Sequence, residues 1–155
     1  MGKRKTAVVV PAWLGPNKMY NSAKGQSYVF GLFTIGARRI SFAADEEVSV
    51  DVARKQATIE WPFWLAGGGC RLKTPSGAWI VAFGRPFPDA PAPDQEKIEA
   101  AATALEGLQA AAGQVSDLAD LGAGVLKDLV GFAQAMTDIR KGRRAAETVK
   151  AALGT

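Results

Sequence analysis

The side chains that most often carry out chemistry are sparse in this 155-residue sequence. It contains no histidine, so neither a Cys-His nor a Ser-His-Asp arrangement can be assembled, and histidine ligands for a metal are excluded. Cys70 is the single cysteine and cannot form a disulfide within the chain. Because it begins an apolar stretch with no base near it in sequence, we predict that Cys70 is a small buried hydrophobe.

Two glycine-rich stretches resemble nucleotide-binding loops only superficially. AGGGCRL at 66–72 lacks the Gly-Lys-Ser/Thr of a phosphate-binding loop, and the segment after it has strand character. GAG at 122–124 lies within a helical pattern and does not follow a strand. The acidic triplet at 45–47 is typical of a solvated hairpin tip. We therefore predict a protein that is not an enzyme and that has no cofactor and no metal site.

Positive charge is concentrated in the first part of the chain. Residues 1–87 hold 12 Lys and Arg against 5 Asp and Glu, whereas residues 88–115 hold 1 against 5. This excess favours an anionic partner for the first half, although a solvated surface explains it equally well. No apolar stretch approaches the ~20 residues of a membrane span, and the N-terminal apolar run is short. We expect a cytoplasmic protein, and the Ala- and Gly-rich composition is typical of a bacterial one.

A proline-rich segment, RPFPDAPAPDQ at 85–95, separates two kinds of pattern. Before it, apolar residues alternate in short runs that end at turn residues, as in the hairpin turn expected at Gly36-Ala37. These runs predict seven strands, at 7–14, 28–35, 38–44, 47–52, 57–65, 70–74 and 78–83. Seven short strands joined by short turns indicate a small antiparallel barrel or sandwich within residues 1–93.

Residues 94–155 have a helical pattern. One amphipathic helix is expected to begin at Asp94, and a second at Ser116. The second has an apolar stripe that continues in phase through Ala146, Val149 and Leu153. Its members are Leu118, Leu121, Val125, Leu129, Phe132, Met136 and Ile139. The stripe is longer than a barrel of this size needs, so we predict that it contacts a protein partner or a second copy.

The stretch EWPFWLAGGGC at 60–70 combines aromatic residues with three glycines. Alternation places Trp61 toward the core, and Pro62 then interrupts the strand. Phe63 and Trp64 cannot both face the core of a regular strand, so one ring is exposed unless the C-terminal helices cover it. We expect the helices to cover it, and we assign Trp64, together with the stripe, to the interface with a partner or a second copy. A ring that dips into a membrane is the alternative.

The stretch GLFTIGARRISF at 31–42 resembles the strand-turn-strand signature of GRAM and other bacterial pleckstrin-homology-like domains, approximately G-x-L-x-V-T-x-R-R-L-x-F. Gly31 matches the leading glycine, and Arg38 and Arg39 match the paired basic positions. Gly36 departs from the family, which usually has threonine there. The resemblance covers roughly 7–112. It implies an α+β fold, a seven-stranded antiparallel barrel or sandwich with a C-terminal helix at one end. The helix beginning near Asp94 would fill that place, and the second amphipathic helix would follow.

The resemblance also implies a non-catalytic role, either lipid head-group binding or protein docking. Lys18 and Lys24 in the loop after the first strand, with Arg38 and Arg39 on the next hairpin, are the candidate anion-binding residues. Solvated strand ends and ion pairs are the alternative for the paired arginines. We expect an adaptor whose helical tail associates with protein. Peripheral binding to an anionic membrane is the alternative, aided by the basic cluster Arg140, Lys141, Arg143 and Arg144. Nucleic-acid binding is unlikely because most aromatic residues occupy inward positions.

Overall fold

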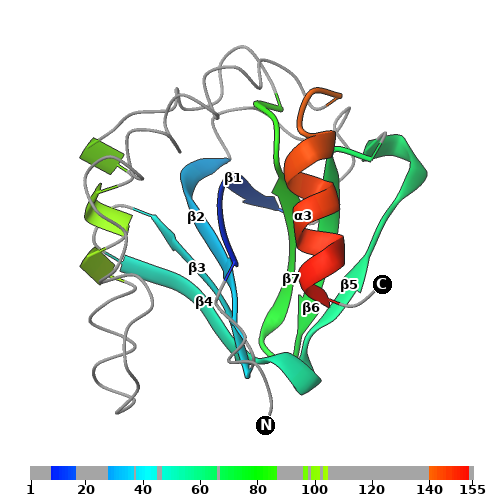
Figure 1. Cartoon of the computed structure of the whole chain (residues 1–155). Helices are drawn as coiled ribbons and strands as arrows, with labels where there is room; N and C mark the ends of the chain where they lie inside the picture. Colours follow the sequence, from blue (N-terminus) through cyan, green and yellow to red (C-terminus); the bar gives the residue numbers. More distant parts are fainter. Residues whose placement is uncertain are drawn as a thin grey trace, which may run out of the picture.

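The structure, a computed structural model, describes residues 8–16, 28–36, 38–44, 47–65, 67–86, 96–97, 99–101, 103–104 and 140–153, without the side chains at 47, 48 and 64. Seven strands form one antiparallel sheet, with helix α3 (Arg143–Leu153) beside it (Figure 1). The strands are β1 (Val8–Pro16), β2 (Val29–Ile35), β3 (Arg39–Ala44), β4 (Glu47–Ala53), β5 (Thr58–Glu60), β6 (Gly69–Thr74) and β7 (Gly77–Ala82). The predicted α+β class and the predicted strands are confirmed.

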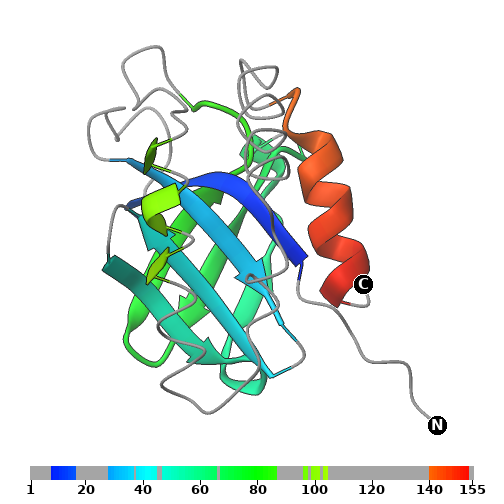
Figure 2. The same ribbon diagram turned by 60° about the vertical axis from the view of Figure 1, so that its left-hand side comes forward.

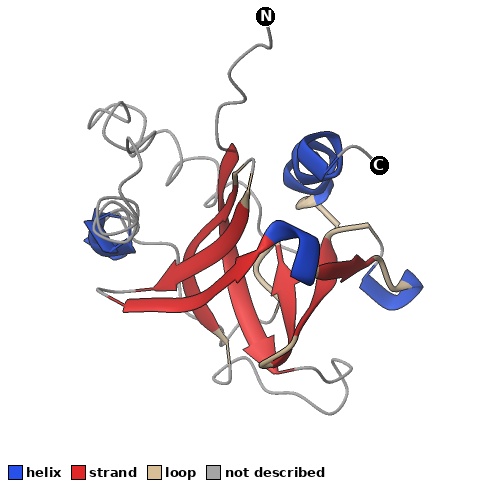
Figure 3. Cartoon of the chain, turned by 90° about the horizontal axis from the view of Figure 1, so that it is seen from below, coloured by secondary structure: helices blue, strands red, loops and turns tan. Residues whose placement is uncertain are grey.

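The strand order β4-β3-β2-β1-β7-β6-β5 consists of two meanders that meet where β1 pairs with β7. Each meander follows the chain, because hairpin-connected neighbours pair antiparallel with little loop-closure cost. The sheet is bent but not closed, and β4 and β5 are its two edges (Figure 3). The expected closed barrel is therefore observed only as a curved seven-stranded sheet.

β5 is shorter than predicted. Only Thr58–Glu60 pairs with β6, and the chain then turns at Pro62, which has no backbone N–H to donate to a ladder. The 3-10 turn η4 (Phe63–Leu65) follows in place of the rest of the strand. A second such turn, η3 (Arg54–Gln56), connects β4 to β5.

Apolar side chains from both meanders and from α3 form one hydrophobic cluster on the inner face of the bend. The strand residues alternate as predicted, with Val50 and Val52 of β4 buried and Ser49 exposed. α3 contributes Ala145, Ala146 and Val149 to the same cluster. The strand members of the cluster are Val10, Ala12, Leu14, Phe33, Ile35, Ile40, Phe42, Ala44, Val50, Val52, Cys70, Leu72 and Val81, with Phe83 just after β7.

The helix that packs against this cluster is the last one in the chain. The expected plug was a helix beginning near Asp94; residues 96–97, 99–101 and 103–104 are helical, but none of them belongs to the cluster. They lie on the β2–β4 side of the molecule, away from α3 (Figures 1 and 2). Of the two C-terminal helices expected, the described residues show α3 as a complete element, and the predicted start at Ser116 lies outside them.

The opposite face of the central strands is buried as well. Trp13 and Phe30, on paired positions of β1 and β2, are at most 2% exposed, and their rings lie 4.8 Å apart. Leu32, Ala43 and Ala82 continue this buried face across three more strand positions. The strands at the centre of the sheet are thus covered on both sides, which leaves functional side chains to the edges and the connecting loops.

Candidate functional site

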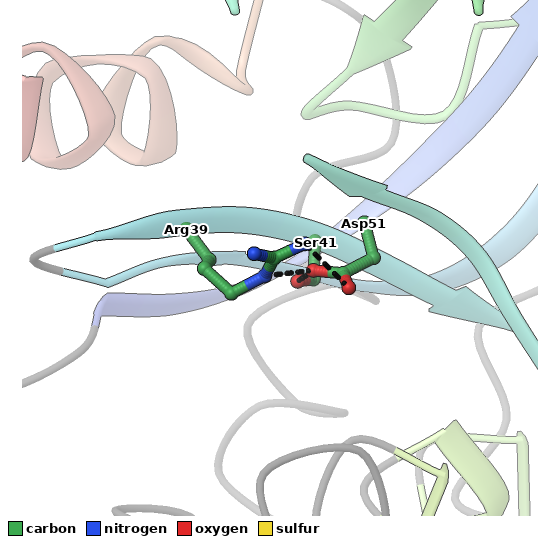
Figure 4. A network of polar contacts seen from close by, with 3 residues as sticks. All are labelled: Arg39, Ser41 and Asp51. Atoms are coloured by element: carbon green, nitrogen blue, oxygen red, sulfur yellow. Dashed lines mark hydrogen bonds and ion pairs between the residues drawn. The ribbon is translucent and has the colours of Figure 1, made fainter. Parts of the chain in front are cut away.

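Arg39, one of the predicted anion-binding residues, is engaged by its own sheet. Its guanidinium donates from Nε and Nη2 to the two carboxylate oxygens of Asp51, at 2.8 and 2.9 Å (Figure 4). The buried Ser41 donates its hydroxyl to the same carboxylate at 3.0 Å. The hydrogen bond from Arg39 to Asp51 raises the pKa of Arg39. This bidentate pair corresponds to the ion-pair alternative for the paired arginines.

The other predicted anion-binding residues do not form a described cluster with it. Arg38 is exposed, and its carbonyl accepts a backbone hydrogen bond from Arg54 at 2.7 Å. Lys18 and Lys24 lie outside the described residues. The four-residue site implied by the resemblance is thus represented in the structure by Arg38 and Arg39 alone, and Arg39 is already paired.

Arg54 connects three elements at the C-terminal end of α3. It donates from Nη2 to the carbonyl of Ala152 at 2.6 Å and from Nη1 to the carbonyl of Gly36 at 3.2 Å. Ala152 lies in the last turn of α3, where carbonyls lack partners within the helix and the helix dipole is negative. The cation therefore fixes this end of α3 to the β2–β3 turn.

The opposite end of α3 approaches the sheet through backbone contact. Gly142 is buried directly before the helix, and a Cβ atom built there would lie 2.5 Å from the backbone nitrogen of Gly84. Along the helix, Lys150 places its ammonium 4.7 Å from the centre of the Trp61 ring. Trp61 packs against the inner cluster, as predicted, with its ring 6.4 Å from that of Phe83. α3 is thus fixed at both ends and along its length.

The loop between β5 and β6 holds an aromatic ring in solvent. Phe63, the first residue of η4, is 91% exposed, whereas Leu65 at the end of the same turn is fully buried. Backbone hydrogen bonds from Leu65 to Pro62 and from Gly68 to Leu65 stabilise the turn. The expectation that C-terminal helices cover this ring is wrong for Phe63, because α3 packs beside the loop and not over the ring. The side chain of Trp64 is not among those described.

The basic cluster predicted near the last helix lies at the same end of the molecule as this loop. Arg140, Lys141, Arg143 and Arg144 are all exposed. Arg143 reaches the loop, since a Cβ atom at Gly67 would lie 3.5 Å from its Nε. We call Phe63 and these four basic residues the η4–α3 patch. Figure 1 shows the start of α3 and η4 in the upper part of the picture, with η4 to the right of the helix, while η3 and the end of α3 lie in the lower part.

The two groups of basic residues, one at Arg38 and Arg39 and the other at 140–144, lie in different parts of the structure. Arg38 lies in the β2–β3 turn, whose Gly36 carbonyl accepts from Arg54 as does Ala152 in the last turn of α3, whereas the basic residues of the η4–α3 patch lie at the first turn. An 11-residue helix is about 16 Å long, so the groups lie at opposite ends of α3. The loop that carries Phe63 meets the basic cluster through Gly67 and Arg143, a contact that no local pattern indicates.

Glu60 and Cys70, two other residues of the described chain that could take part in chemistry, have structural roles. Glu60 accepts hydrogen bonds from Arg71 and Lys73, each at 3.2 Å. Both hydrogen bonds lower the pKa of its carboxyl, and the one from Lys73 has the larger effect. Cys70 is fully buried, as predicted, and burial raises the pKa of its thiol. No group of three His, Cys, Asp or Glu residues suited to a metal ion occurs among the described residues.

The predicted interface stripe cannot be placed on the structure. Its members from Leu118 to Ile139 lie outside the described residues, whereas the continuation of the stripe, Ala146 and Val149, is buried in the core. In the part of the chain that the structure describes, no helix has the length and apolar character needed to cross a bilayer. Comparison of the chain with protein-family models, curated proteins and solved structures finds no match.

Proposed function

We propose that this chain is a non-catalytic interaction module, a pleckstrin-homology-like domain that docks onto a protein partner or a second copy. Support for the fold comes from seven antiparallel strands in two meanders and a last helix over their shared core. The number of strands and a C-terminal helix agree with what the resemblance of residues 31–42 implies, although the helix is α3 and not the one beginning near Asp94, and the sheet is not closed. Support for the role comes from the structural use of Arg39, Asp51, Glu60 and Cys70, none of which is assembled into a reactive group.

The observation that carries the proposal is where the chain leaves and rejoins its core. Phe83 and Gly84 end the β7 segment, and Gly142, which begins the return through α3, lies against their backbone. The chain between them, the 57 residues 85–141, therefore leaves the sheet and returns to it at neighbouring points. The inner core of the described residues is built from strands and α3 without them. A segment anchored in this way, with an apolar stripe at 118–139, is suited to contact a partner.

The test measures association of the full chain by light scattering coupled to size exclusion over a concentration series. We expect a mass above that of the monomer, and Leu121→Asp combined with Leu129→Asp should return the mass to the monomer value. Gln134→Asp combined with Lys127→Asp is the matched control, because both residues lie on the opposite side of the predicted helix. A monomer at all concentrations, unchanged by the stripe substitutions, would contradict the proposal.

A second function, binding to an anionic membrane, is favoured by one specific observation. Phe63 is exposed on the loop whose Gly67 lies against Arg143 at the start of α3, and α3 is fixed in the core. This surface belongs to the scaffold and not to the 118–139 stripe, so the two functions involve different residues.

A further inference from the structure

We propose that the η4–α3 patch is a docking surface for an anionic lipid bilayer, with the Phe63 ring inserted among the lipid head groups and Arg140, Lys141, Arg143 and Arg144 against their phosphates. The proposal is independent of the adaptor function, because it uses no residue of the 118–139 stripe. It also differs from the anion site implied by the resemblance, which lies near the β2–β3 hairpin.

The Phe63 ring is exposed to solvent. Among the described large hydrophobic residues only Phe63 and Val29 are exposed, at 91% and 41%. A single exposed apolar side chain is common on protein surfaces and by itself indicates nothing. Phe63, however, is almost fully exposed at the tip of a turn whose neighbour Leu65 is buried, so the backbone presents the ring outward.

The start of α3 is rich in positive charge. Residues 140–153 contain five basic residues and one acidic residue, Glu147. Four of the five basic residues precede or begin α3, where the helix dipole is positive and disfavours cations. All four are exposed. A dense positive field on an exposed surface complements an anionic partner.

The loop that carries Phe63 and the start of α3 are both fixed to the core and contact each other. The η4 loop is fixed by Leu65 in the core and by the hydrogen bond from Phe83 to Gly68 at 2.9 Å. α3 is fixed by Ala145 and Ala146, and Arg143 lies against Gly67 of the loop. A ring and cations presented from one fixed end of the molecule match a bilayer interface, which offers an apolar medium and phosphates over a broad surface. An acidic protein satisfies chiefly the charges, and a nucleic acid would need an unpaired base to stack on the ring.

The test is co-sedimentation of the full chain with vesicles of phosphatidylcholine alone or with phosphatidylglycerol added. We expect binding to the anionic vesicles only, weakening as salt is added. Phe63→Ser should lower the partition coefficient about tenfold, and Arg140→Glu with Arg144→Glu should lower it at least as much.

Matched controls use the same chemistry elsewhere on the surface. Val29→Ser removes the other exposed apolar side chain, and Arg38→Glu with Lys55→Glu makes the same charge change near the opposite end of α3. Both controls should bind like the parent chain, and circular dichroism should show that every variant is folded. If the Arg38 and Lys55 pair lowers binding and the Arg140 and Arg144 pair does not, the proposal is overturned.

Other results separate the bilayer from other anions. Vesicle binding that is independent of Phe63, or that is abolished by soluble glycerol phosphate at the same phosphate concentration, would overturn the proposal. So would binding to a polynucleotide through these residues without binding to vesicles. The chain carrying Leu121→Asp and Leu129→Asp should still bind vesicles, so a failed adaptor function and a failed membrane function give different results.

Discussion

Asp51 accepts hydrogen bonds from two side chains of the neighbouring strand, and the two donors differ in their environment. Arg39 is 43% exposed at its side chain, whereas Ser41 is buried. Water can replace the carboxylate as a partner for Arg39, but it reaches the Ser41 hydroxyl poorly. The contribution of Asp51 to stability should therefore come mainly from Ser41, even though the arginine pair is the more conspicuous contact.

Substitution of each partner tests this difference. Arg39→Ala removes an exposed ion pair and should cost less than about 1 kcal/mol of unfolding free energy. Asp51→Ala deprives a buried hydroxyl of its acceptor and should cost about 1 to 3 kcal/mol. Urea denaturation followed by fluorescence measures both. Ser41→Ala combined with Asp51→Ala is the control, since the double variant should be no less stable than Asp51→Ala. Equal losses for Arg39→Ala and Asp51→Ala would show that the ion pair dominates.

Ionisation of the buried Tyr28 phenol makes the stability of the fold depend on pH in the alkaline range. It is 1% exposed, and its ring covers Gly15, where a Cβ atom would lie 2.4 Å from the ring. Burial raises the pKa of Tyr28 to about 12. The fold therefore favours the neutral phenol, so this contribution is complete below the unfolded pKa of about 10 and is lost as pH rises toward 12.

The Tyr28→Phe variant removes this titration. Its unfolding free energy should fall less steeply than that of the parent chain between about pH 10 and 12, and the difference should reach about 2 kcal/mol. Denaturation midpoints in urea across this range give the comparison. Ionisation of Cys70 also lowers the stability of the fold at high pH, because burial raises the pKa of its thiol. Cys70 is present in both proteins, so it does not affect the difference between them. Parallel pH profiles would contradict the expectation.

At the scale of the elements, the strands could be predicted because their signals are local. Alternating apolar residues and turn-forming glycines placed all seven strands close to their observed bounds. The exception is β5, where Trp61, Phe63 and Trp64 resemble a continuing strand but Pro62 ends the ladder. Gly31 is required by strand packing, which the alternation pattern alone does not show. A Cβ atom there would lie 2.0 Å from the carbonyl oxygen of Ala43, so the close pairing of β2 with β3 requires glycine.

The attachment of α3 to the sheet through Arg54 gives a prediction at this scale. Arg54→Met keeps the apolar stem and removes the donors to the carbonyls of Ala152 and Gly36. We expect the unfolding free energy to fall by about 2 kcal/mol, because hydrogen bonds from a charged donor contribute more to stability than neutral ones. Amide exchange in the last turn of α3 should accelerate more than exchange in the strands.

The adjacent exposed residue provides the matched control. Lys55→Met makes a similar change at an exposed side chain and should leave stability and exchange unchanged. If Arg54→Met accelerates exchange uniformly across the sheet and the helix, Arg54 stabilises the whole domain and does not act specifically on the end of α3.

At the scale of the whole molecule, the sequence could not show which helix completes the core. Both C-terminal patterns present an apolar face, and their periodicity is similar. The choice of α3 depends on contacts between distant residues, namely Gly142 with Gly84 and Lys150 with Trp61. The η4–α3 patch depends on the same placement. The sequence shows its basic residues and Phe63 as separate features, and only the position of α3, with Arg143 against Gly67, relates them.

Because α3 shares one hydrophobic cluster with both meanders, the helix and the sheet should unfold together. Val149 is fully buried between them, and Val149→Ala removes two methyl groups, at a cost of about 2 kcal/mol. Far-ultraviolet circular dichroism reports mainly helical residues, those of α3 among them. Tryptophan fluorescence reports all four tryptophans, of which Trp13 and Trp79 lie in the sheet and Trp61 packs beside it. Both should give one midpoint, lowered equally in the variant.

The exposed Ala151→Gly serves as a helix-only control, with a loss of about 1 kcal/mol of unfolding free energy. If the dichroism midpoint fell alone in Val149→Ala, α3 would be a separately melting appendage. The η4–α3 patch would then lack the rigid base on which its proposed docking depends.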